Sequence, residues 1–174
     1  RYARMLLHTL ARIHTDLRVV VPPKATADLG LPPGITVQRF GKMRGHAWEQ
    51  LSLPSALRKG DFLLNPANAA PLRVHKQAVV VHDLAFLHHP EWFDVRFAKW
   101  YGFLMPLVVR RSAVVVTVSE TMRQELITTF ELPAEKVIVV PPYADPQQFS
   151  RSERVNVPDR FFLFRIQTPS IARR

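Results

Sequence analysis

The chain has 174 residues, of which 47% are hydrophobic, and its formal net charge is +10. This apolar content excludes a disordered chain and is sufficient for one compact domain with a sizeable core. The absence of cysteine excludes disulfides, thiolate metal sites and a cysteine nucleophile. The longest unbroken apolar run, Phe103 to Val109, is much shorter than the roughly 20 residues that a membrane span needs.

The positive charge is concentrated at the two ends of the chain. Residues 1–18 carry +3 and residues 151–174 carry +4, so the 132 residues between them carry only +3. Nucleic-acid binding usually needs a basic stripe on one face, and no such stripe is visible here. We therefore expect no nucleic-acid partner.

The first 15 residues have the apolar spacing of an amphipathic helix. Tyr2, Met5, Leu6, Leu10 and Ile13 recur at intervals of mostly three and four. No N-cap residue precedes them, and the chain begins with Arg1 rather than Met. We therefore expect that a segment upstream of this helix is missing.

The rest of the chain alternates between short apolar runs and helical patterns. Strands are predicted at 17–21, 35–40, 61–65, 78–81, 113–118 and 137–140, and helices at 48–57, 94–111 and 119–130. A bend or a restart of the helix is expected at Pro54, and a kink at Pro106, because proline lacks the backbone N–H that a helix interior uses.

The last three predicted strands are continuous runs rich in β-branched residues. Such runs are typical of parallel sheets that are covered on both faces. With helices between the strands, they predict an α/β fold with a Rossmann-like, doubly wound parallel sheet. The domain is expected to cover 1–149, followed by a polar linker at 150–159 and a strand at 160–164 that opens a second domain.

In open parallel sheets, ligands bind beyond the carboxyl ends of the strands. His82 and Asp83 follow the strand 78–81, so the imidazole could donate a hydrogen bond or exchange a proton there. Asp83 could orient His82 or hold a substrate hydroxyl. The alternative is that His82 satisfies local backbone groups and Asp83 caps the turn.

Two other loops leave strand ends with polar residues. Ser119 and Glu120 begin the helix 119–130, where free amide groups favour an anion, although capping alone is the simpler role for Ser119. Asn65 and Asn68 belong to the loop 65–71, where they could set turns or contact a ligand.

The neighbouring histidines His88 and His89 do not predict a metal site, because no cysteine or helically spaced histidine accompanies them.

The helix 94–111 is rich in aromatic and basic residues. It could lie on an anionic membrane surface or pack on the sheet as a thick core helix, and we favour the core helix. No Gly-rich dinucleotide motif, Walker loop or Gly-x-Ser-x-Gly elbow is present.

Several short motifs occur in an order and spacing that resemble a known family. They are Trp48-Glu49-Gln50-Leu51 with Pro54, the loop 65–71, His82-Asp83-Leu84, His89-Pro90-Glu91-Trp92-Phe93, Thr117-Val118-Ser119-Glu120 with Arg123, and Glu135-Lys136-Val137 followed by Pro141-Pro142 and Asp145. Together they resemble the N-terminal domain of retaining GT-B glycosyltransferases of family four, over about residues 1–164.

This resemblance implies transfer of a sugar from a nucleotide-sugar donor to an acceptor hydroxyl, with the anomeric configuration retained and without a metal or other cofactor. The domain would hold the acceptor, a glycan or a lipid-linked sugar. His82 would lie beside the transferring sugar, and Asp83 would support its loop or meet acceptor hydroxyls. The pieces Trp48-Glu49-Gln50-Leu51 and His89-Pro90-Glu91-Trp92-Phe93 resemble a subgroup of bacterial enzymes of polysaccharide assembly. This resemblance implies a hexose such as mannose and a cytoplasmic protein in peripheral contact with the inner face of the membrane.

The chain departs from the family pattern at both ends. The family's first strand and Gly-rich loop are absent, so we expect an unfilled position in the sheet. Residues 160–174 would be an aborted or altered start of the donor-binding domain. Because a leaving diphosphate needs positioned cationic groups, the 174 residues alone are expected to be inactive.

Two alternatives remain at this point. One is a basic binding module for anionic lipid or nucleic acid, without catalysis. The other is a different sugar-nucleotide enzyme of GT-B fold, such as an epimerase or a phosphorylase.

Overall fold

The structure is a computed structural model that describes residues 2–13, 16–25, 31 and 35–142. All of them belong to one unit of the chain, Arg1–Pro142. The linker predicted at 150–159 and the strand predicted at 160–164 lie outside the described residues.

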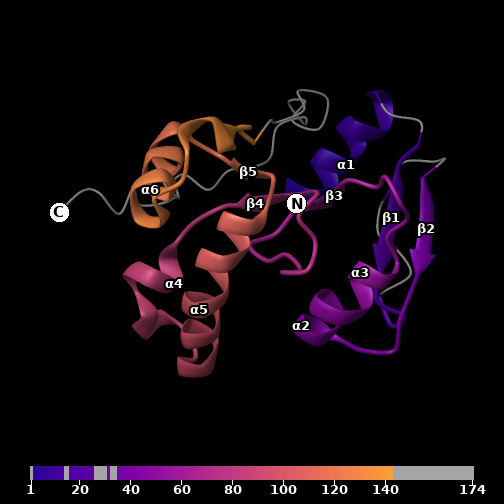
Figure 1. Ribbon diagram of the computed structural model, residues 1–174, viewed down its shortest axis with the longest axis horizontal. Helices are drawn as coiled ribbons and strands as arrows, with labels where there is room; N and C mark the ends of the chain where they lie inside the picture. The colour runs from indigo at the N-terminus through magenta and orange to yellow at the C-terminus, as the bar shows by residue number, and fades with distance from the viewer. Residues whose placement is uncertain (1, 14–15, 26–30, 32–34, 143–174) are drawn as a thin grey trace, which may run out of the picture. The chain divides into compact units, whose positions relative to one another are not determined.

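The described elements follow the predicted order closely (Figure 1). They are α1 (Tyr2–Ile13), β1 (Arg18–Val21), β2 (Thr36–Arg39), α2 (Gly45–Ala47), η1 (Trp48–Ser52), α3 (Leu53–Ser55), β3 (Leu63–Asn65), β4 (Gln77–Val81), α4 (Ala85–His88), η2 (Pro90–Trp92), α5 (Val95–Arg111), β5 (Val114–Thr117), α6 (Glu120–Phe130), η3 (Ala134–Lys136) and β6 (Val137–Val139).

Local chemistry explains where the two long helices of the second half begin. Asp94 caps α5, because its Oδ1 accepts from the backbone N of Arg96 at 2.9 Å and of Phe97 at 3.2 Å. The Ser119 hydroxyl caps α6 by accepting from the N of Met122 at 3.2 Å. Of the bend or restart expected at Pro54, the structure has a restart with a change of helix type, since η1 ends at Ser52 and α3 begins at Leu53. The N–H of Leu53 bonds to the carbonyl of Trp48, which closes the π-helical turn η1 just before the proline.

All strand pairs are parallel, which confirms the α/β class with parallel sheets. The strands form two sheets rather than one: β1 pairs with β2, and a second sheet has the order β3-β4-β5-β6. Within these sheets β1 and β3 each have a paired neighbour on one side only. A cavity of about 1450 Å³ is lined by residues of α1, β1 and β3.

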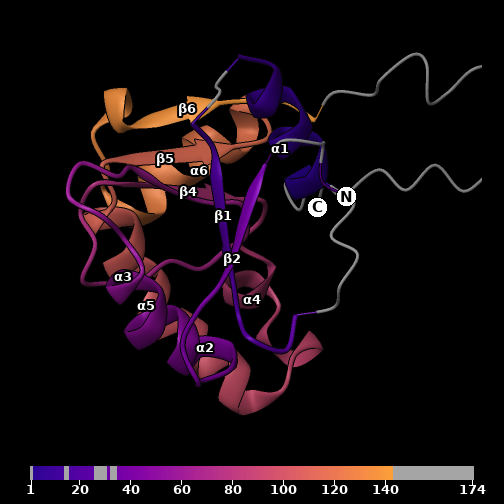
Figure 2. The same cartoon turned by 90° about the vertical axis from the view of Figure 1, so that its right-hand side faces the viewer.

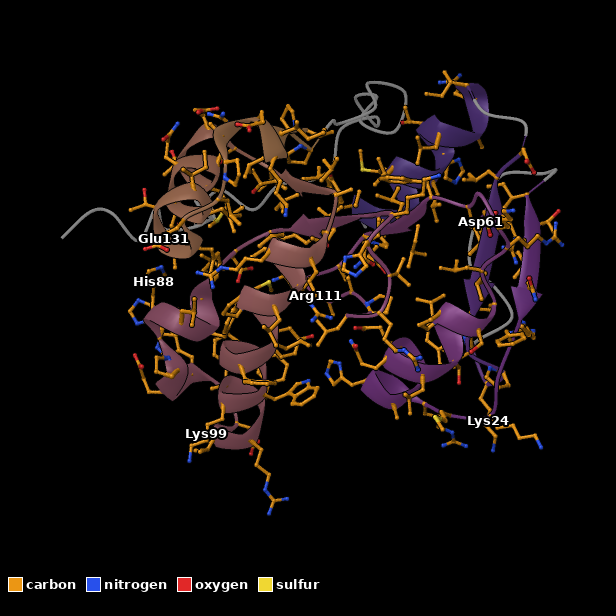
Figure 3. The ribbon with its side chains drawn as sticks, viewed as in Figure 1. Lys24, Asp61, His88, Lys99, Arg111 and Glu131 are labelled. Carbon is orange, nitrogen blue, oxygen red and sulfur yellow. The ribbon has the colours of Figure 1, made fainter. Side chains whose placement is uncertain are left out.

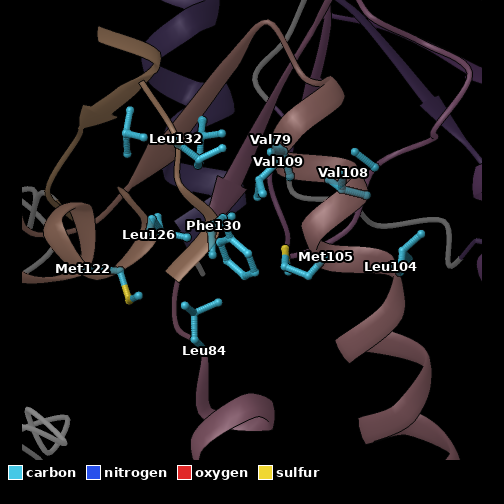
Figure 4. Close-up of a cluster of buried hydrophobic side chains, with 14 of the residues drawn as sticks. Val79, Leu84, Leu104, Met105, Val108, Val109, Met122, Leu126, Phe130 and Leu132 are labelled. Atoms are coloured by element: carbon cyan, nitrogen blue, oxygen red, sulfur yellow. The ribbon is translucent and has the colours of Figure 1, made fainter. Parts of the chain in front are cut away.

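The centre of the four-stranded sheet, β4 and β5, is covered on both faces, as the β-branched runs predicted, whereas Ile138 of β6 is exposed. On one face, α5 and α6 cover Val79, Val81, Val115 and Val137 with a larger set of apolar side chains (Figure 4). That set includes Leu104, Met105, Val108, Val109, Met122, Leu126 and Phe130. On the other face, Ala78, Val80 and Val116 pack against Tyr2 and Leu6 of α1. Figures 1 and 2 show α1 and α5 on opposite sides of this sheet.

Candidate active site

The parallel four-stranded sheet brings the predicted polar loops to one edge. Val81 is in register with Thr117, and Asn65 is in register with Val79. Because the strands run in the same direction, the loops that leave β3, β4 and β5 emerge at the same edge. The residues after these strands, namely the loop 65–71, His82 and Ser119, are therefore neighbours at this edge.

His82 is held by three groups at this edge, one at its backbone and two at its ring. Its backbone N donates to Asn68 Oδ1 at 2.8 Å, and its ring Nε2 lies 3.1 Å from the carbonyl oxygen of Pro66. The Tyr2 ring meets the imidazole edge-on, with ring centroids 4.9 Å apart. A carbonyl can only accept, so the neutral imidazole that satisfies it carries its proton on Nε2. Nδ1 is then the ring nitrogen that can accept a proton or a hydrogen bond.

Asn68 and Asp83 fix the backbone around this histidine. Besides accepting from His82, the Asn68 side chain donates from Nδ2 to the Asp83 carbonyl oxygen at 3.3 Å. The carboxylate of Asp83 accepts from the N of Ala85 at 3.1 Å and so helps to start α4. Asp83 is exposed, so the same carboxylate is both a turn cap and accessible to a solute.

Asn65 faces the interior rather than the exposed surface of its loop. It is buried, and its Nδ2 donates to Gln77 Oε1 at 3.0 Å and to the Ala78 carbonyl at 3.3 Å. Gln77, which is fully buried, passes the network on by donating to the Pro71 carbonyl at 2.9 Å. These bonds tie both ends of the loop 65–71 to the start of β4.

Ser119 and Glu120 both have partners within α6. The Ser119 hydroxyl is the N-cap, and the Glu120 carboxylate accepts from Gln124 Nε2 and from Arg123, each at 2.9 Å. The hydrogen bond from Gln124, followed by that from Arg123, lowers the pKa of Glu120. Ser119 therefore caps α6, which is the simpler of the two roles expected for it. Anion binding at this helix end stays a prediction.

Two residues at this edge were not among the predicted site residues. Tyr2 contacts the His82 ring, donates from its hydroxyl to the Val140 carbonyl at 3.3 Å, and has its pKa raised by burial. Burial also raises the pKa of Glu49, which lines the cavity together with Asn65, Pro66 and Ala67. The position of Tyr2 on the apolar face of the first helix indicated burial, but nothing in its spacing indicated a histidine partner.

The cavity borders the loop 65–71 at Asn65, Pro66, Ala67 and Ala69. It is lined by Pro66, whose carbonyl contacts the His82 ring. Gln50 holds the C-terminal end of this loop. Its side chain donates to the Ala70 carbonyl and accepts from the N of Leu72, each at 2.9 Å. A ligand in the cavity would therefore meet a braced loop beside an imidazole.

No group of three or more His, Asp or Glu side chains in the described part of the chain could hold a metal ion. His88 and His89 have separate partners: His88 contacts Glu125, whereas His89 lies 3.0 Å from Glu91 and stacks on Trp92. Among the helices of the described residues, none has the length and apolar content to cross a bilayer.

The class of this protein rests on its parallel α/β fold and on a family model. A family model described as Glycosyltransferase Family 4 matches residues 1–148, and the chain belongs to this family. Comparisons with curated proteins and with solved structures gave no match.

Proposed function

We propose that this domain is the acceptor-binding half of a retaining glycosyltransferase of GT-B fold. In the reaction, the acceptor hydroxyl forms a bond to the anomeric carbon of a nucleotide sugar. The bond from that carbon to the diphosphate oxygen breaks, its electron pair stays on the nucleoside diphosphate, and the hydroxyl proton passes to that leaving group or to water. The donor sugar would be a hexose such as mannose, and the acceptor a glycan or lipid-linked sugar of bacterial polysaccharide assembly. We place this activity in the cytoplasm.

Membership of glycosyltransferase family 4 and the setting of His82 support this proposal. An imidazole whose Nε2 is occupied by a backbone carbonyl can present only Nδ1 to a sugar hydroxyl, in a fixed orientation. Asp83 is the exposed carboxylate next to it and is suited to accept from acceptor hydroxyls. Family membership does not favour the alternative of a binding module without catalysis.

The assignment of the site is tested by acceptor binding to the chain itself. A panel of hexose glycans and lipid-linked sugars would be screened by ligand-observed NMR. We expect His82→Ala to weaken the best ligand about tenfold, because one well-placed hydrogen bond contributes about 1.4 kcal/mol. His75→Ala is the control, since His75 is exposed in the turn before β4. Equal binding by the His82 and His75 variants would refute the site.

Catalysis is tested separately with nucleotide sugars. We propose that the 174 residues alone give no turnover, because the cationic groups that stabilise a leaving diphosphate belong to the second domain of the family pattern. A steady-state assay with a panel of nucleotide sugars measures this. Robust turnover by this chain would show that the domain needs no second half.

A further inference from the structure

The first half of α5 leaves a mixed aromatic and basic stripe in solvent. Arg96, Lys99, Trp100 and Phe103 stand at intervals of three and four residues, so they share one helix face. Trp100 is 40% exposed and Phe103 is 64% exposed. Trp92, in the turn η2 that precedes the helix, is 60% exposed. Isolated exposed aromatics are ordinary, but Trp100 and Phe103 are adjacent, with ring centroids 6.4 Å apart, and adjacent exposed rings indicate a surface for a partner.

The rest of α5 is not exposed in this way, because the helix also has a buried face. Leu104, Met105, Val108 and Val109 are all 1% exposed or less and pack on the sheet. From the sequence, this segment could be a core helix or a helix on a membrane surface. In the structure, different parts of α5 have these two characters. The second half of α5 is core, whereas its first half presents large apolar rings to solvent.

A second basic and apolar segment lies beside this stripe. The His46 ring in α2 contacts Trp100, with ring centroids 5.9 Å apart. The loop that leads into α2 carries Met43, 43% exposed, between the exposed cations Lys42 and Arg44. In both views, α2 and the first half of α5 lie on the same side of the unit (Figures 1 and 2). Figure 3 shows Lys99 extending outward from this end of α5.

The cations of the stripe are available for a partner of opposite charge. The two nearest acids in the sequence are already engaged: Asp94 caps α5, and Glu91 is paired with His89. Among the described residues, Arg96 and Lys99 form no ion pair with a carboxylate. Exposed aromatic rings interleaved with unpaired cations fit the interface of an anionic bilayer, where rings sit at headgroup level and cations meet lipid phosphates.

We propose that this surface, the docking face formed by Trp92, Arg96, Lys99, Trp100, Phe103 and the loop 42–44, binds anionic lipid bilayers. The helix lies along the membrane surface and does not enter it deeply, since its opposite side is core. This inference does not rest on the proposed sugar transfer, because it uses no residue of the candidate active site.

The chain supplies its own probe for the test. Of its three tryptophans, Trp48 is buried and donates to the Phe40 carbonyl, whereas Trp92 and Trp100 belong to the docking face. Vesicles of phosphatidylcholine alone would be compared with vesicles of equal parts phosphatidylcholine and phosphatidylglycerol. We expect flotation with the anionic vesicles only, a blue shift of the tryptophan emission, and weaker binding as salt is raised.

Charge variants locate the binding surface. Each cation near an anionic membrane contributes about a fivefold factor in affinity, so Arg96→Gln with Lys99→Gln should weaken binding about 30-fold. The matched control is Arg73→Gln with Lys76→Gln, which removes the same charge from exposed positions. That control lies towards the other end of α5, where Arg111 donates to the Leu72 carbonyl. Trp100→Ser with Phe103→Ser should reduce the blue shift, to which Trp92 still contributes.

Several results would overturn the proposal. Equal binding to neutral and anionic vesicles would show that charge does not contribute to the affinity. Equal losses of affinity in the two charge variants would show that the docking face is not the binding surface. Concentration-dependent dimers that Trp100→Ser with Phe103→Ser dissolves would identify a second copy of the chain as the partner. Binding of duplex DNA in place of vesicles would identify a nucleic acid.

Discussion

Replacement of Asn68 tests whether the loop beside His82 is braced as the structure describes. The Asn68 side chain has two bonds of different kinds: Oδ1 accepts from the His82 backbone N at 2.8 Å, and Nδ2 donates to the Asp83 carbonyl at 3.3 Å. Asn68→Ala removes both bonds. Asn68→Asp keeps an acceptor for His82 and removes only the donor to Asp83.

The two bonds differ in what their loss costs. The His82 N–H is partly buried, and a buried donor without a partner costs about 1–3 kcal/mol. The bond to the exposed carbonyl of Asp83 contributes about 0.5 kcal/mol. Asn68→Ala should therefore lower the free energy of unfolding by about 2 kcal/mol, and Asn68→Asp by less than about 1 kcal/mol.

Urea unfolding followed by circular dichroism measures this difference. With an m value of about 2 kcal/mol/M, Asn68→Ala should lower the midpoint by about 1 M. Ser55→Ala is the control, because its hydroxyl bonds the Leu51 carbonyl at an exposed position. If Asn68→Ala lowers the urea midpoint no more than Ser55→Ala does, the Asn68 hydrogen bonds do not stabilise the fold. If Asn68→Asp is as unstable as Asn68→Ala, the acceptor role is wrong.

Two further predictions concern the loop before α2 and the segment before β3. Gly41 has φ +81°, and a Cβ there would come within 2.6 Å of the Ser52 Cβ. Gly41→Ala should therefore lower the urea midpoint more than Gly45→Ala, which shares a positive φ of +53° but meets nothing within 4 Å; equal losses would show that only backbone strain matters. The backbone N–H of Arg58, followed by the Arg18 guanidinium, lowers the pKa of Asp61. The stabilisation is complete above the unfolded pKa, about 3.9, and is lost as pH falls through the lower folded pKa. Asp61→Asn should then flatten the acid side of the stability curve, and an unchanged acid side would contradict this assignment.

The order and type of the main elements follow from local sequence alone. Helix spacing and β-branched runs act over a few residues, and α1, α5, α6 and the six strands occur within a few residues of their predicted positions. The caps Asp94 and Ser119 are equally local, since each side chain bonds backbone atoms two or three residues away. The short elements α4 and η2 were not predicted, because four-residue and three-residue helices have too little periodicity to be read.

The sequence by itself also placed His82, Asp83 and Ser119 at one edge of a sheet, because all strands of a parallel sheet end on the same side. The roles of these side chains depend on partners distant in the chain. Asn65 faces Gln77 inside the protein, Tyr2 meets the ring of His82 across 80 positions of sequence, and β1 separates from β3 into another sheet. No local pattern encodes such contacts. They are decided by how α1 and the loop 65–71 pack against the strands, so only the tertiary structure shows that the His82 Nε2 lies against the Pro66 carbonyl and that Tyr2 packs on the ring.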